Sequence, residues 1–284
     1  MAAQAGEPET GATNHGDFKL SITQALGDQL ATALGRLRPA PLTQQNLSTL
    51  DNRPGVYQLY RNGEFVYVGK ADKSLPARIL KHLRKVSGRQ GIDLAEMTFT
   101  CLYVAEDFSA LAPEKLLIKH YKGQGQIPWN NNGFGNNDPG KRRDETVVTA
   151  NHFDAFFRID LERTVPGLAA GPIALSKLLA KVSKEAPYTF RYEKKKMGDA
   201  YKKIVELPGD ELTIAQLFAI TAAALPNNWQ IAVLPGRAIL YPDNRHNYPS
   251  VWRYYRGDEI LDVEPEIGAA EDIPEEPDTE SDEG

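Results

Sequence analysis

Five residues between positions 57 and 114 carry side chains that could hydrolyse a phosphate diester: Tyr57, Tyr67, Arg78, His82 and Glu114. Such a reaction needs a base that activates water and a cation that stabilises charge on the phosphoryl oxygens. It also needs a divalent metal that binds the phosphate and the leaving oxygen. A lone Glu with open positions for water suits Mg²⁺, which keeps several waters and prefers oxygen ligands. The set therefore predicts metal-assisted phosphodiester hydrolysis.

Each of these residues also has an ordinary structural interpretation. The two tyrosines could be cross-strand aromatic neighbours, which are common in sheets. Arg78 and His82, four residues apart, could form a solvated helix face. Glu114 could be a first-turn acid that the helix dipole favours. The hydrolytic interpretation therefore depends on the whole pattern.

Alternating helices and strands must position these side chains. Arg61-Asn62-Gly63 joins two β-rich runs, and Asn-Gly is a strong hairpin signal. Apolar residues at helical spacing predict the helix that carries Arg78 and His82, and Pro113 suits the first turn of a later helix. A loop should separate the first helix from the hairpin. The expected order is helix, two-stranded hairpin, helix, strand and helix, over residues 20–37, 55–60, 64–69, 75–86, 97–104 and 112–121.

The two strand motifs and the residues after them resemble the GIY-YIG nuclease superfamily. Gly55-Val56-Tyr57 and Tyr67-Val68-Gly69 stand where that family has Gly-Ile-Tyr and Tyr-Ile-Gly, and valine keeps a β-branched residue in each strand. The resemblance is closest to the small type II restriction endonuclease branch. That branch shows an Arg and a His four apart, Glu before Leu-Leu-Ile, a Trp-Asn pair and a Gly-Phe-Gly-Asn block. This chain has the last three at Glu114–Ile118, Trp129-Asn130 and Gly133–Gly140.

The resemblance covers about residues 20–145 and implies an α/β domain with a small central β-sheet flanked by helices. It implies that Glu114 binds Mg²⁺, with Mn²⁺ as an alternative metal, and that the metal holds the scissile phosphate. Tyr57 would take a proton from the attacking water, helped by Lys70 or His82. Lys70 could instead hold the phosphate, or belong only to the basic surface.

Three further roles are implied by the same resemblance. Arg78 would stabilise the charge of the transition state, Tyr67 would orient the phosphate, and Asn130 would position the region around Glu114. One departure from the branch is an apparent insertion at Gly123–Gln126, which lengthens the segment before Asn130.

The Gly- and Asn-rich segment after Trp129 is expected to be an ordered loop with several residues at positive φ. Its amides could contact base edges of DNA or hold the turns of the loop itself. A short basic run follows it. The expected DNA contacts are two amides and three cations: Asn136, Asn137, Lys141, Arg142 and Arg143.

Charge is unevenly distributed along the chain. The formal net charge is −5, but residues 258–284 hold 13 acidic residues and no basic one. Residues 18–257 keep 22 acidic residues against all 33 Lys and Arg, a formal charge of +11, which suits a partner with closely spaced phosphates. The single cysteine, Cys101, excludes an internal disulfide and a Cys-based zinc cluster. No apolar run is long enough to span a membrane, so we expect a cytoplasmic protein with no membrane partner.

We expect four segments: a disordered leader (1–16), a nuclease domain with its N-terminal helix (17–148), an α+β accessory domain of unknown role (149–257) and an acidic disordered tail (258–284). In the accessory domain we expect strands over 153–161, 188–192, 229–234 and 237–241. We expect helices there over 173–182 and 212–225.

The leading functional interpretation is a sequence-specific endonuclease that cuts double-stranded DNA in restriction or phage defence. One active site per chain predicts a homodimer on DNA. A structure-specific repair or mobile-element nuclease is an alternative, in which residues 149–257 select junctions or bind a protein partner. A non-catalytic DNA-binding or interaction module on a nuclease scaffold is an alternative from another class.

Overall fold

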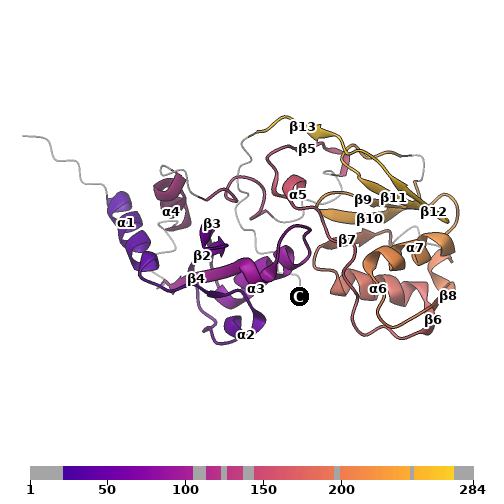
Figure 1. Ribbon diagram of the computed structural model, residues 1–284, viewed down its shortest axis with the longest axis horizontal. Helices are drawn as coiled ribbons and strands as arrows, with labels where there is room; N and C mark the ends of the chain where they lie inside the picture. The colour runs from indigo at the N-terminus through magenta and orange to yellow at the C-terminus, as the bar shows by residue number, and fades with distance from the viewer. Residues whose placement is uncertain are drawn as a thin grey trace, which may run out of the picture.

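The computed structural model describes residues 22–104, 113–122, 127–136, 144–194, 199–243 and 246–271. It has an N-terminal lobe built on a small antiparallel sheet with helices and a C-terminal lobe built on a larger sheet (Figure 1). The predicted α/β class with an α+β unit after it is confirmed. Within the described residues no helix is both long and apolar enough to cross a membrane.

The N-terminal sheet is centred on a hairpin. β2 (Gly55–Arg61) and β3 (Glu64–Ala71) pair antiparallel, and Asn62 and Gly63 have φ of 51° and 79°, as a tight primed hairpin turn requires. β4 (Met97–Tyr103) pairs with the other side of β2. The expected loop before the hairpin instead contains a short helix α2 (Gln44–Leu47) and a strand β1 (Ala40–Pro41), which pairs with β4 and gives the order β1-β4-β2-β3.

Helices cover both faces of this sheet. α1 (Ile22–Gly35) and α4 (Pro113–Lys122) lie side by side on the face that carries Val56 and Val68 (Figure 1). α3 (Leu75–Ser87) packs on the opposite face, among the buried side chains of the two predicted catalytic tyrosines. Because successive residues of a strand point to opposite faces, the two valines and the two tyrosines are separated in this way.

The C-terminal lobe has a five-stranded sheet in the order β12-β11-β9-β10-β7, with α6 and α7 on one face (Figure 1). β7 and β10 are parallel, and the other neighbours are antiparallel. A second, two-stranded sheet pairs β6 with β8. The bounds are β6 (Gly171–Ala174), α6 (Leu175–Glu185), β7 (Thr189–Tyr192), β8 (Ile204–Leu207), α7 (Ile214–Ala224), β9 (Gln230–Val233), β10 (Arg237–Tyr241), β11 (Arg253–Arg256) and β12 (Glu259–Asp262). Short 3₁₀ helices lie in the connections, among them η1 (Leu94–Glu96) and η4 (Ala200–Lys202).

The strand expected over 153–161 is wrong. The structure has a short helix α5 (Phe153–Phe156), which begins where the His152 ring accepts the Asp154 backbone N–H. The apolar side chain of Phe153 is buried in the N-terminal core. The helix expected over 173–182 begins at residue 175, because residues 171–174 pair with β8.

The prediction of a disordered tail over residues 258–284 is wrong for the first part of that segment, which contains two strands. β12 pairs with β11, where the Arg253 guanidinium donates to both Asp262 carboxylate oxygens, and this pairing offsets the acidic charge. β13 (Ile267–Gly268) pairs with β5 (Val148–Thr149). The chain is therefore ordered through Glu271, whereas residues 272–284 and the expected leader lie outside the described residues.

The end of α3 joins the two lobes. The buried Arg89 guanidinium donates to the carbonyls of Phe157 and Pro235, at 3.1 and 3.2 Å, and lies 2.9 Å from a carboxylate oxygen of Asp154. Arg84 donates to the carbonyls of two C-terminal-lobe residues, Lys184 and Ala186. These contacts fix the position of α3 relative to the second sheet.

Candidate active site

Tyr57 and His82 form a buried hydrogen-bonded pair. The Tyr57 hydroxyl lies 2.6 Å from His82 Nε2, and both side chains are almost fully buried. Burial lowers the pKa of His82 well below its ordinary value, and the positive charges of Arg78, Lys85 and Lys81 lower it further. The imidazole is therefore neutral, and Nε2 can accept the hydrogen of the Tyr57 hydroxyl.

Aromatic rings hold this pair in place. The rings of Tyr57 and Tyr67 lie 6.1 Å apart, and Tyr67 lies 5.2 Å from the His82 ring. Phe134 stacks on His82 at 4.8 Å and meets Tyr67 edge-on at 4.9 Å. Phe134, the Phe of the Gly-Phe-Gly block, is a positioning residue that was not among those predicted from the sequence.

Gly69 makes room for both tyrosines. It lies opposite Tyr57 in the β2–β3 pair, and an added Cβ would overlap the Tyr57 phenol and come 2.8 Å from Tyr67 Cε1. Gly55, at the start of the first motif, has a comparable constraint, since a Cβ there would overlap the backbone of Leu102. Steric limits near the open end of the hairpin thus explain the glycine of each motif.

A bulge in β3 brings Tyr67 to the face that carries Tyr57. The register shifts between Leu59 and Tyr60, so that Val66 is the extra residue and the alternation after it is reversed. The Trp129 N–H donates to the Val66 carbonyl at 2.9 Å. Asn130 then accepts the Val68 N–H and donates to the Val68 carbonyl, both at 2.9 Å.

Asn130 therefore binds the free edge of β3, at the central residue of the second motif. Its predicted role was to position the region around Glu114. The two bonds described here act on Val68, next to Tyr67 and Gly69, and the role toward Glu114 stays a prediction. We infer that this side chain, buried like its surroundings, fixes the strand that carries Tyr67.

Lys70 lies apart from the Tyr57–His82 pair. By strand alternation it shares the face of Val56 and Val68, and its ammonium is 3.0 Å from a carboxylate oxygen of Asp72. Lys70 and Arg78 both line a small hollow of about 50 Å³. Of the two predicted helpers of Tyr57, His82 is the one that contacts the phenol.

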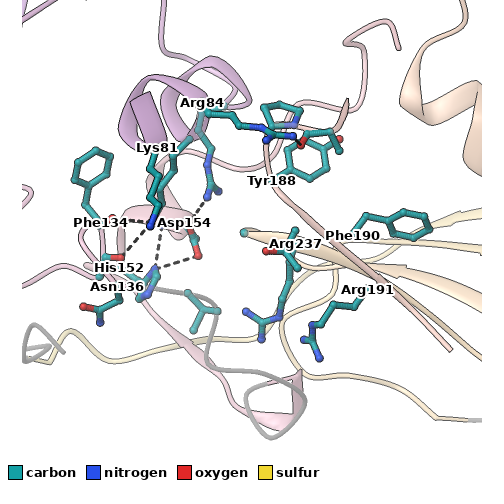
Figure 2. Close-up of a pocket in the computed structure, with 18 of the residues that line it drawn as sticks. Lys81, Arg84, Phe134, Asn136, His152, Asp154, Tyr188, Phe190, Arg191 and Arg237 are labelled. Carbon is teal, nitrogen blue, oxygen red and sulfur yellow. Dashed lines mark hydrogen bonds and ion pairs between the residues drawn. The ribbon is translucent and has the colours of Figure 1, made fainter. Parts of the chain in front are cut away.

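A cleft of about 960 Å³ lies between the two lobes, and His82 and Arg78 line the wall that the N-terminal lobe forms. Figure 2 shows Lys81 and Arg84 on α3 across from Arg191 and Arg237 of the second sheet. The residues that line the cleft include two acids, Asp154 and Glu271, and eight bases: Arg78, Lys81, Arg84, Lys85, Arg89, Arg191, Lys194 and Arg237.

Lys85 is anchored at the floor of this cleft. Its ammonium donates to the Phe134 carbonyl at 2.7 Å, and burial is the main cause that lowers its pKa to about 8. Lys81 and Lys85 follow Arg78 at helical spacing, so the sequence alone carries a signal for a basic face on this helix. The bases from the second lobe had no such signal, because only the folded chain brings them to α3.

The other predicted site residues are placed only in part. Asn136 lines the cleft, whereas Asn137, Lys141, Arg142 and Arg143 lie outside the described residues. The structure describes the backbone of Glu114 in the first turn of α4 but not its side chain. The described residues contain no group of three or more His, Cys, Asp or Glu that could hold a metal ion. Metal binding by Glu114 thus remains a prediction.

Comparisons with known proteins cover the second hairpin motif and the residues after it. Residues 60–154 match the family model of the Eco29kI GIY-YIG domain. UvrABC system protein C of Christiangramia forsetii (strain DSM 17595 / CGMCC 1.15422 / KT0803) is 37% identical over 86 residues. That similarity covers 29% of this chain and only 14% of the length of the relative.

Proposed function

We propose, from the premise that residues 60–154 are a GIY-YIG domain of the Eco29kI type, that the protein is a DNA endonuclease that hydrolyses phosphodiester bonds. The observation that carries this proposal is the Tyr57–His82 hydrogen bond of 2.6 Å beside a strongly basic cleft. Basic residues attract the phosphate backbone, and a phenol bonded to a neutral imidazole can pass a proton.

In the proposed reaction, Tyr57 accepts a proton from the attacking water while its own hydroxyl proton passes to His82 Nε2. A phenol with an ordinary pKa near 10 gains basicity only if it can release its proton, and neutral His82 provides the acceptor. Arg78, one helical turn before His82, stabilises the negative charge that develops on the phosphoryl oxygens. Tyr67 orients the phosphate. Since the pair is buried, the phosphate enters where His82 and Arg78 line the cleft.

Mg²⁺, with Mn²⁺ as an alternative, is the metal that this donor set fits. A site with one carboxylate ligand suits Mg²⁺, which keeps several waters and binds substrate phosphate. Glu114 would hold the ion. When bound, the metal would polarise the scissile phosphate and neutralise charge on the leaving oxygen.

The finer role that we propose is sequence-specific cleavage of double-stranded DNA by a homodimer, in restriction or phage defence. The family match supports this role. The similarity to UvrABC system protein C favours a second candidate, a structure-specific nuclease of DNA repair. Sequencing the ends of cleaved plasmid separates the two roles: defined ends at a palindrome indicate the first, and cleavage confined to junctions or damaged sites indicates the second.

The proposed activity is tested by conversion of supercoiled plasmid to nicked or linear DNA in Mg²⁺ and in Mn²⁺. Glu114→Ala should abolish cleavage and keep DNA affinity, because the metal acts mainly on charge that develops in the transition state. Glu206→Ala, at an exposed position of β8, is the matched control and should cleave normally. A wild-type protein that leaves plasmid intact with either metal would refute the proposed function. Cleavage by Glu114→Ala at the normal rate would refute the metal assignment.

A further inference from the structure

We propose that the C-terminal lobe forms the second wall of the DNA-binding site and contacts the phosphate backbone of duplex DNA, with Lys194 as a principal contact. This inference rests on the proposed function and extends it to a part of the chain outside the 60–154 match. The cleft runs from α3, beside the Tyr57–His82 pair, to the edge strand β7. DNA bound at His82 would therefore face this second wall.

The exposed lysines of the cleft have ammonium groups that are available to a ligand. Lys81 on α3 and Lys194 after β7 are both exposed and line opposite walls. Neither forms an ion pair with any described residue. The Lys194 ammonium lies 5.2 Å from the centre of the Tyr192 ring, and this contact orients the side chain without neutralising it.

Bases outnumber acids at the cleft. Asp154 pairs with Arg89 at 2.9 Å, and the buried Asp144 pairs with Arg191 and Arg237, so these acids offset part of the positive charge. The eight bases that line the cleft still exceed Asp144 and the two lining acids, Asp154 and Glu271. Arg84 donates to two backbone carbonyls, which leave its full charge at the wall. A surface that gathers positive charge from elements far apart in sequence is the electrostatic pattern expected for a polyanion with regular spacing.

The second wall is held rigidly enough to act as a binding surface. Arg191 and Arg237 leave neighbouring strands on the face opposite to α6 and α7, and both lie within 2.7 Å of one carboxylate oxygen of the buried Asp144. The Arg89 contacts fix this sheet to the end of α3. Cations on a preorganised wall lose less conformational freedom on binding than cations on a flexible segment.

The test is the salt dependence of duplex binding. Fluorescence anisotropy with a short labelled duplex, in EDTA so that no cleavage occurs, gives the affinity between 50 and 200 mM salt. Each lost phosphate contact reduces the slope of log K against log salt by about 0.9. Over this fourfold range the wild type should therefore weaken about 3.5-fold more than Lys194→Ala, and Lys194→Arg should restore the wild-type slope.

Lys177→Ala is the matched control, because Lys177 is exposed on α6 and does not line the cleft. It should bind like the wild type. An unchanged slope for Lys194→Ala, or an equal change for Lys177→Ala, would overturn the inference. Plasmid cleavage by the same proteins in Mg²⁺ separates this inference from the proposed function. A wild type that cleaves, with normal binding by Lys194→Ala, refutes only the second wall, whereas the expected slopes without cleavage refute only the nuclease activity.

Discussion

We expect neutral His82 to make the protein less stable in mild acid, and His82→Gln to remove part of that effect. Burial, and then the charges of Arg78, Lys85 and Lys81, lower the pKa of His82 in the folded protein below its value of 6.5 in a free chain. The unfolded chain therefore binds a proton that the folded chain excludes. The stability that neutral His82 contributes is complete above pH 6.5 and is lost as the pH falls toward the folded-state pKa. Where the unfolded chain binds one full proton more than the folded chain, the unfolding free energy falls by about 1.4 kcal/mol for each unit that the pH is lowered.

Urea unfolding of the wild type and of His82→Gln at pH 7.5, 6.5 and 5.5 measures this contribution. Glutamine keeps a side-chain amide next to Tyr57 but does not titrate, and the other ionisable groups are common to both proteins. Between pH 6.5 and 5.5 the unfolding free energy of the wild type should fall by about 1 kcal/mol more than that of the variant. Equal losses in the two proteins would contradict a neutral, buried His82.

Three further changes follow from the site geometry and the charge distribution. Gly69→Ala should lower the unfolding free energy by about 1–3 kcal/mol and slow cleavage, since its Cβ would overlap the tyrosine rings; Gly209→Ala, with open space around it, should do neither. Asn130→Ala removes the side chain that bonds both backbone groups of Val68, so hydrogen exchange at the Val68 amide should become faster and stability should fall by about 1–3 kcal/mol. Deleting residues 272–284, which include seven acidic residues, should tighten duplex binding at low salt and matter less at high salt, and superimposable titrations would exclude competition by this segment.

The parts of the fold that local sequence signals determine could be predicted. Asn62-Gly63 suffices for the hairpin, since few other residues adopt positive φ at both positions of its turn. α3 follows from its apolar spacing, and its start follows from Ser74, whose side chain accepts the Ala77 N–H. These two elements bring Tyr57 near His82, so the candidate site could be predicted together with them.

Features that depend on long-range packing could not be predicted. The segment at 153–161 has strand-like apolar residues, but Phe153 is buried in the N-terminal core and the chain turns into α5. The acidic composition after residue 257 suggested a solvated tail, whereas Arg253 and the edge of β11 hold β12 in the sheet. The second wall of the cleft could not be predicted from the sequence, because Arg191 lies across from α3 only in the folded chain.

The central claim is that the buried phenol–imidazole pair carries out proton transfer in a nuclease, and the single-turnover cleavage rate of Tyr57→Phe tests it most directly. Loss of the hydroxyl leaves His82 Nε2 without the Tyr57 hydrogen bond and should cost about 1–3 kcal/mol of stability, so the rate is measured well below the melting temperature of the variant. We predict that Mg²⁺-dependent cleavage falls by about 10²–10⁴-fold while duplex affinity is kept. Cleavage at the wild-type rate by folded Tyr57→Phe would contradict the account.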